Sequence, residues 1–125
     1  MTRTILVALV LTAVTPVHAA APGSATDFLA RAERLKSKGP LAFFDSDYGR
    51  LKAQATAVGK SIENDRIAAE RERRPILYCS PSPRAELGNF EFIRGLEAIA
   101  SSELQHMSLK DAMLRVLQRK YPCRT

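Results

Sequence analysis

Residues that could carry catalysis or bind a metal are scarce in this sequence. It contains two cysteines and two histidines in 125 residues. A structural zinc site takes about four Cys or His ligands, and only Cys79, Cys123 and His106 lie beyond the first 20 residues. Gly-x-Ser-x-Gly turns, calcium loops and phosphate-binding glycine loops are also missing. We therefore predict a protein that is not an enzyme and that holds no cofactor or metal.

The sequence also lacks the apolar–polar alternation of strands, internal repeats and low-complexity segments. Helical spacing of apolar residues instead predicts helices over 28–38, 46–73, 90–100 and 109–121, with a turn at 41–45 and a turn or short helical piece at 101–107. Ser24 and Ser108 each precede an acidic residue by three positions, as in a capping box, and Asn89 is the expected cap of the third helix. The predicted fold class is all-α: a small bundle of about four helices, one of them long, with one disulfide.

The long helix has one continuous apolar stripe. Its members recur at intervals of four and three residues, which predicts a buried face: Phe44, Tyr48, Leu51, Ala55, Val58 and Ile62. A helix of about 28 residues extends about 42 Å, whereas a domain of this size has a radius of gyration of about 13 Å. Part of the helix is therefore expected to project or to be covered by a second copy in a homodimer. Gly49 and Gly59 either weaken the helix or mark close contact with another helix.

Two carboxylates stand at the start of this helix. Asp45 and Asp47 could be considered as a glycosidase pair, but capping explains acidic residues at a helix start more simply. We therefore expect Asp45 or Ser46 to be the N-cap.

Residues 1–20 are typical of a secretory signal peptide. Arg3 precedes an apolar run from Ile5 to Val14, Pro16 ends the run, and three alanines follow at 19–21. The run is too short to cross a bilayer, so residues 21–125 are expected to form one exported domain without a transmembrane segment. The net charge is +6. Export makes nucleic acid a poor partner for this charge and favours an acidic protein, a phospholipid surface or the cell wall.

The two cysteines are expected to pair. An even number of cysteines in an oxidising compartment favours a disulfide, and Cys79 and Cys123 allow one intrachain pairing. Chain-entropy arithmetic for a loop of this size gives about 4 kcal/mol of stabilisation. The alternative is a pair of buried free thiols.

The second half of the chain has a recognisable order of motifs. Tyr78-Cys79 is followed by a Pro-rich loop, a helix, a short link, Ser108–Ala112, a helix and Tyr121-Pro122-Cys123. This order resembles the periplasmic immunity proteins of type VI secretion, the Rap/Tai group. The resemblance implies a periplasmic, all-helical protein, often a homodimer, that binds and inhibits a cell-wall amidase effector of the cysteine peptidase type. The family is expected to have an aromatic-Cys motif in the second helix, but the corresponding residues 43–49 of this chain contain no cysteine. We therefore assign no inhibitory residue from the resemblance.

Two surfaces are candidates for contact with such a partner. The first is the loop from Pro81 to Asn89, which offers Arg84 and Glu86 as polar contacts and Leu87 as an apolar anchor; the alternative is an ordinary connector. The second is the basic run of Arg71, Arg73 and Arg74, which would bind in a salt-sensitive way; the alternative is a solvated helix end.

Two other functions remain open at this point. One is a periplasmic structural or adaptor module without a toxin partner. The other is a small cell-wall hydrolase. Both would be exported in the same way.

Overall fold

Helices make up the regular structure of this protein. The computed structural model describes residues 23–124, and the predicted signal peptide at 1–20 lies outside this range. The elements, in order, are α1 (Ala25–Ser37), the 3-10 helix η1 (Gly39–Phe44), α2 (Ser46–Arg71), α3 (Asn89–Glu97), α4 (Ser101–Leu104) and α5 (Leu109–Lys120), and the described residues form no strand. The predicted all-α class and the long helix are confirmed. The structure adds a 3-10 helix where a turn was expected.

The helices begin at capping side chains that the sequence indicates. Ser24 Oγ accepts a hydrogen bond from the backbone N of Asp27 at 3.1 Å, and Ser108 Oγ accepts one from the backbone N of Asp111 at 3.0 Å. These two caps lie side by side, because residues 24 and 108 form an isolated antiparallel bridge. The start of α1 is thereby tied to the start of α5.

The caps of the two middle helices differ in how well the sequence predicts them. Asp45 caps α2 as expected, since its carboxylate accepts a hydrogen bond from the backbone N of Asp47 at 2.8 Å. The prediction for α3 was wrong: its N-cap is Gly88, and Asn89 is its first residue. The Glu91 carboxylate compensates by accepting a hydrogen bond from the backbone N of Gly88 at 3.2 Å.

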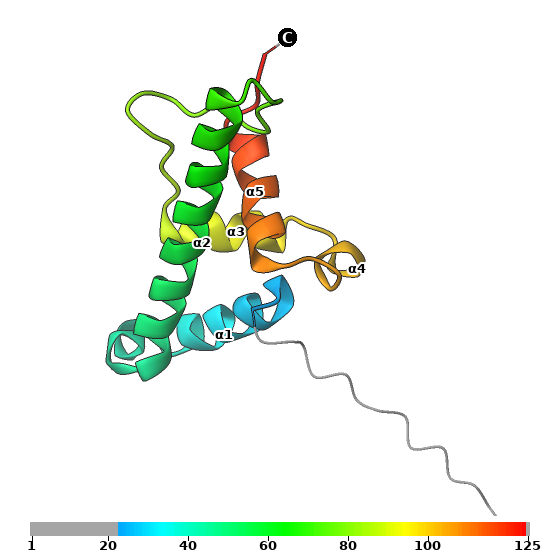
Figure 1. Cartoon of the computed structure of the whole chain (residues 1–125). Coiled ribbons are helices and arrows are strands. Elements are labelled where there is room, and N and C mark those ends of the chain that lie inside the picture. The colour runs from blue at the N-terminus through cyan, green and yellow to red at the C-terminus, as the bar shows by residue number, and fades with distance from the viewer. Residues whose placement is uncertain (1–22, 125) are drawn as a thin grey trace, which may run out of the picture.

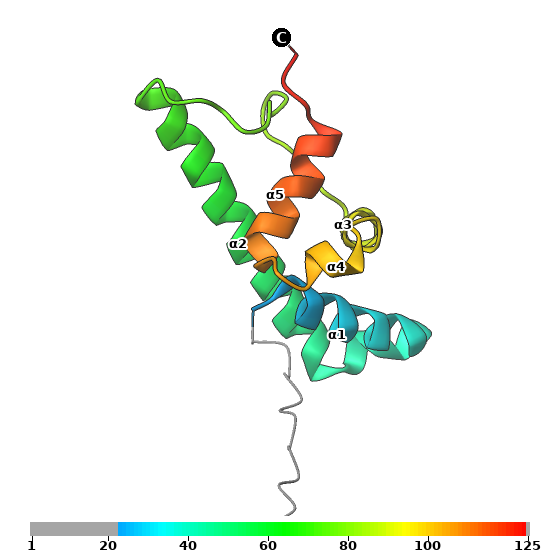
Figure 2. The same cartoon turned by 90° about the vertical axis from the view of Figure 1, so that its right-hand side faces the viewer.

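The helices pack around α1 and α5. The helix α1 contacts α2, α3 and α5, and α5 contacts both α2 and α3. Figure 1 shows α1 crossing the end of α2 that lies next to η1, while α5 stands beside the other part of α2. Figure 2 shows α2 and α5 diverging toward the end where residues 72–88 leave α2. The long helix thus links two ends of the domain, and its 26 residues span about 39 Å.

The apolar stripe of α2 is buried along most of its length. Leu51 and Ile62 are buried, and Tyr48, Ala55 and Val58 pack against the core. Phe44 was wrongly included in the stripe, because the side chain is 88% exposed. The reason is local: Phe44 belongs to η1 and precedes the turn at Asp45, so it does not share the face of the helix that follows.

Among the glycines of the described residues, Gly95 in α3 is the one packed most tightly against another helix. A Cβ atom at this position would be 2.6 Å from Cγ1 of Val116 in α5. A Cβ at Gly59 would make an ordinary contact of 3.7 Å with Met113, and one at Gly49 would meet nothing within 4 Å. Tight packing of a glycine therefore occurs between α3 and α5, and the two glycines of α2 do not mark such a contact.

A disulfide joins the segment after α2 to the end of α5. Cys79 and Cys123 are bonded, with their Cα atoms 4.9 Å apart and a sequence separation of 44 residues, which confirms the predicted pairing. The backbone N of Cys79 also donates a hydrogen bond to the carbonyl of Tyr121 at 2.9 Å. A disulfide is consistent with a location outside the cytoplasm.

Within residues 23–124, no helix combines the length and the apolar composition that crossing a bilayer requires.

Candidate functional site

A cleft of about 420 Å³ lies between α1, η1, the first half of α2 and the start of α3. We call it the apolar cleft. Its walls are mainly aromatic and aliphatic side chains contributed by all four elements: Phe28, Ala32 and Leu35 from α1, Phe43 from η1, Tyr48, Leu51 and Ala55 from α2, and Phe90, Phe92 and Ile93 from α3. Four elements that are distant in the sequence therefore build one concave surface.

Large apolar side chains remain exposed on η1 and α3, two of the elements that build this cleft. Leu41 is 69% exposed, Phe43 68%, Phe44 88% and Phe90 71%, and we call these four the apolar rim. A 3-10 helix has three residues per turn, so Leu41 and Phe44 share one side of η1. The Phe43 ring packs edge-on against Tyr48, with ring centroids 5.1 Å apart. Phe43 thus contacts α2 although most of its own surface stays exposed.

The sequence offered only a weak signal for this surface. An apolar run from Leu41 to Phe44 within an expected turn is unusual, because turns are mostly polar. Nothing in the sequence indicated that Phe90 would stay exposed, because it stands next to Phe92 and Ile93, which were expected on the buried face of the same helix. Phe43 and Phe90 are therefore brought to one cleft only by the packing of the whole fold.

The charged side chains that line the apolar cleft are both cationic. They are Lys36 and Lys52. Lys36 lies 3.5 Å from a carboxylate oxygen of Glu97, and both side chains are substantially exposed. Lys52 forms no ion pair with any residue in the 23–124 range. The cleft therefore presents positive charge to an approaching molecule.

The carboxylates near η1 are already paired with cations. Asp47 accepts a hydrogen bond from Arg31 Nη2 at 2.8 Å and also pairs with Arg34, and Arg31 holds the pKa of Asp47 below its ordinary value. Asp45 pairs with Lys38, which lowers the pKa of Asp45. Neither carboxylate cancels the charge of Lys52. The two residues cap and brace the start of α2, as the sequence predicted.

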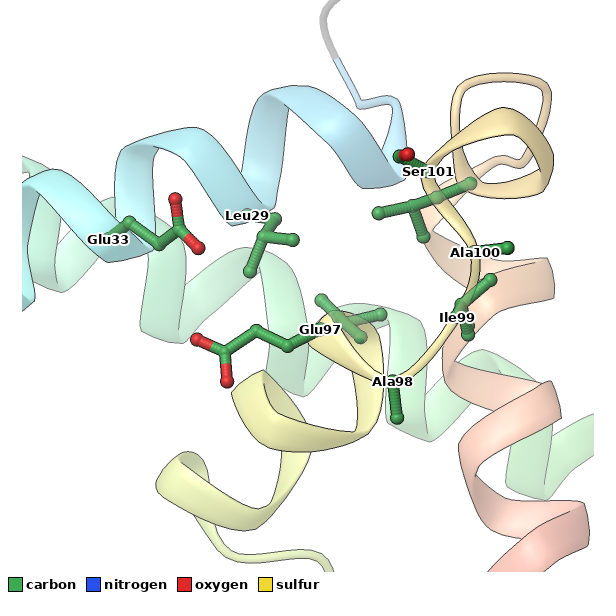
Figure 3. Close-up of a pocket in the computed structure, with 9 residues that line it drawn as sticks. Leu29, Glu33, Glu97, Ala98, Ile99, Ala100 and Ser101 are labelled. Atoms are coloured by element: carbon green, nitrogen blue, oxygen red, sulfur yellow. The ribbon is translucent and has the colours of Figure 1, made fainter.

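Figure 3 shows a second, mixed depression of about 480 Å³ between α1 and residues 96–104. Leu29 lies on its wall, and the carboxylates of Glu33 and Glu97 lie on one side of it, away from Ser101. Glu97 is engaged with Lys36. The depression therefore does not bring a nucleophile and a base together.

The predicted contact loop is held by the end of α5. Tyr121 Oη donates a hydrogen bond to the carbonyl of Glu86 at 2.9 Å, and Lys120 Nζ donates one to the same carbonyl at 2.7 Å. Leu87 is half-buried and packs against the core, so much of its apolar surface is already covered. Arg84 is exposed and forms no ion pair with the described residues. Asn89 lines the apolar cleft.

The three predicted arginines lie at the other end of α2. Arg71 is the last residue of α2, and Arg73 follows with a backbone φ of +53°. Arg74 pairs with Glu72 at 2.5 Å. Arg71 lies 16 residues beyond Ala55, the last residue of α2 that lines the apolar cleft, which is about 24 Å along the helix. Among the predicted contact residues, Asn89 thus lies at the apolar cleft, whereas the three arginines lie away from it.

A polar network ties the loop before Cys79 to α2. The buried Tyr78 donates from its Oη to Glu63 Oε2 at 2.7 Å, and Arg66 donates to both oxygens of Glu63 at 3.0 and 2.7 Å. Burial, and then the hydrogen bond to Glu63, raise the pKa of Tyr78 to about 12. Arg66 lowers the pKa of Glu63. Each group has its partner within the network, which serves to fix the loop.

No protein-family model, no curated protein and no solved structure matches this chain. The resemblance to the Rap/Tai group therefore stays a prediction. Groups of three or more His, Cys, Asp or Glu side chains that could hold a metal ion do not occur in the described part of the chain. His106 is exposed and contacts the neighbouring Gln105 side chain. The apolar cleft and the apolar rim are therefore the candidate functional site of this chain.

Proposed function

We propose that this chain is an exported, periplasmic protein-binding protein that inhibits a cell-wall amidase effector by direct contact. The observation that carries the binding role is the apolar rim around the apolar cleft. Exposed contiguous apolar surface marks interaction sites, and aromatic side chains are enriched in protein interfaces. The amidase and the periplasm rest on the resemblance of residues 78–123 to the Rap/Tai group.

The way the domain is held together suits an inhibitor. The disulfide between Cys79 and Cys123 and the Tyr78–Glu63 hydrogen bond brace the same segment. A surface that is ordered before binding loses less conformational entropy on association. Inhibition by contact also requires no titrating centre on the inhibitor.

A homodimer belongs to the same proposal. Only Leu51, Ile62 and Ala69 are buried among the 26 residues of α2, so a large part of its surface is available to a second copy. Sedimentation of the purified protein across a range of concentrations measures this directly. A single monomeric species at all concentrations would remove the homodimer and leave the inhibitor proposal in place.

Co-expression tests the inhibitor proposal. The full chain is produced together with candidate amidases of the cysteine peptidase type directed to the periplasm, and lysis is scored. We expect rescue from lysis and a complex that survives gel filtration. The matched control lacks residues 2–20, and we expect it not to rescue because it stays in the cytoplasm.

The rival functions give different outcomes. Absence of rescue with every amidase, together with capture of an envelope component, would favour the adaptor. Release of wall fragments by the purified protein alone would favour the hydrolase. Either result would reject the inhibitor.

A further inference from the structure

We infer that the apolar cleft receives an amphipathic helix of a protein partner whose polar face is acidic. The inference rests on the proposed protein-binding function and specifies the chemistry of the bound segment. It is carried by the shape of the cleft, the exposure of the rim and the sign of the charges around the cleft.

The length of the cleft matches a helix laid into a groove. Along α2 the cleft extends from Tyr48 to Ala55, which is seven residues or about 10.5 Å. Side chains at positions i and i+7 of a partner helix are separated by the same distance. A helix with apolar residues at i, i+3 or i+4, and i+7 could therefore place its anchors along this wall, as in other helix-in-groove complexes.

The rim favours a macromolecule over a small apolar ligand. The cleft volume alone would suit a small molecule. However, Leu41 and Phe44 are 69% and 88% exposed and do not line the cleft. A molecule confined to the cleft would leave both in water, whereas a longer helix that lies over η1 as well as over the cleft would cover them.

The charges favour an acidic partner. Both charged residues that line the cleft, Lys36 and Lys52, are cationic, and Asp45 and Asp47 are neutralised by their own partners. Carboxylates on the polar face of a bound helix would pair with Lys52 and compete with Glu97 for Lys36. Such complementarity selects the partner and speeds association.

The same charges disfavour two other occupants. In a two-fold symmetric contact the same patch lies on both subunits, so Lys36 and Lys52 of one copy would meet those of the other. A flat bilayer would touch η1, which stands at the edge of the domain in Figure 1, but it could not enter the concave walls behind it. A separate partner chain satisfies both the shape and the charge.

Synthetic peptides test the inference on the full mature chain. The probe is a fluorescent helical peptide of about 18 residues, cross-linked to hold the helix, with leucines at the i, i+4 and i+7 positions and glutamates on the polar face. The matched peptide has lysines in place of the glutamates. Fluorescence anisotropy is expected to give at least about tenfold tighter binding of the acidic peptide, with weaker binding at high salt.

Variants locate the binding surface. We expect Phe44→Ser and Lys52→Glu each to weaken binding of the acidic peptide about tenfold. The controls are Leu77→Ser, which removes another exposed apolar side chain, and Lys60→Glu, which reverses another exposed cation of α2. Both controls should bind within about twofold of the wild type, and circular dichroism checks that all four variants fold.

Several results would overturn the inference. These are no binding, equal binding of the two peptides, or binding that Phe44→Ser and Lys52→Glu do not change. Occupation of the cleft by dodecanoate or anionic vesicles alone, or a dimer that Phe44→Ser dissociates, would identify a different occupant.

Failure of the inference is separable from failure of the proposed function. If an amidase is inhibited equally by the wild type and by Phe44→Ser but not by Arg84→Ala, the inhibitor role stands and the cleft is not its contact. If the acidic peptide binds the cleft and no amidase is inhibited, the inference about the cleft stands and the proposal of amidase inhibition is rejected.

Discussion

Substituting Gly95 by Ala should destabilise the protein although alanine is the better helix former. A methyl group at this position would lie 2.6 and 2.7 Å from the two γ-carbons of Val116 and 3.3 Å from its Cβ. Favourable carbon–carbon contacts occur at about 3.5–4.0 Å, so the overlap is roughly 1 Å. Rotating Val116 would not relieve the contact with its Cβ, and valine in a helix strongly prefers one rotamer.

The expected loss follows from two opposing contributions. Ala gains about 1 kcal/mol over Gly in a helix interior, whereas forcing extra volume into a packed core costs about 1–3 kcal/mol. Because the overlap with both γ-carbons forces α3 and α5 apart, we expect the upper part of this range and a net loss of about 1–2 kcal/mol. For a domain of this size, that lowers the Tm by roughly 4–15 °C.

Urea and thermal unfolding measure the effect, with Gly49→Ala as the matched control. Nothing lies within 4 Å of a Cβ at Gly49, so this variant should be stabilised by about 0.5–1 kcal/mol. Introduced into a Val116→Ala background, Gly95→Ala should lose most of its cost because the γ-carbons are gone. A Gly95→Ala protein at least as stable as the wild type would refute the reasoning, as would an unchanged cost in that background.

Three further predictions concern the disulfide, the hydrogen bond of Tyr78 and the paired carboxylates. Replacing both Cys79 and Cys123 by Ser should lower the free energy of unfolding by about 4 kcal/mol, because the disulfide closes a loop with a separation of 44 residues; urea unfolding checks this, and an unchanged midpoint would contradict it. Tyr78→Phe should cost about 1–3 kcal/mol at pH 7, because Glu63 loses a hydrogen-bond donor. The stability from the raised pKa of Tyr78 is present below pH 10 and is lost as the pH rises through about 12, so the difference between wild type and Tyr78→Phe should narrow in unfolding curves above pH 10; a constant difference would refute this. At the acid end, stability should fall as the pH drops below about 4.5, because these carboxylates have lowered pKa values in the folded state: Asp45, Asp47, Glu63 and Glu91. Unfolding at pH 7 and pH 3 measures this loss, and equal stability at the two values would contradict it.

The starts of the helices were predicted from capping side chains, and the one wrong cap also has a cause in the neighbouring residues. Ser24, Ser108 and either Asp45 or Ser46 were predicted as caps because a side-chain oxygen at a helix start serves the nearest backbone N–H groups, and the structure selects Asp45. Asn89 was assigned the same role, but the preceding Gly88 adopts the extended conformation of the cap and Glu91 supplies the acceptor. The N-cap was thus predicted correctly where the side chain of one residue accepts a hydrogen bond from the first backbone N–H groups of the helix.

The candidate site could be predicted only in part. Asn89, chosen as the end of a contact loop, does line the apolar cleft. Leu87, chosen as an apolar anchor, packs against the core instead, because the end of α5 holds the backbone of its neighbour Glu86. Phe43 and Phe90 were not singled out, since the exposure of each depends on elements far away in the sequence.

The sequence alone determined the helical class, the helix starts at Ser24, Asp45 and Ser108, and the pairing of the two cysteines, since short-range hydrogen bonding and a single available partner decide these features. Tertiary structure alone decided which apolar side chains stay exposed and which glycine is packed tightly against another helix. Burial is set by what packs against a side chain. That packing places Phe43 and Phe90 on the walls of one cleft and brings Gly95 against Val116, and no local pattern connects the members of either pair.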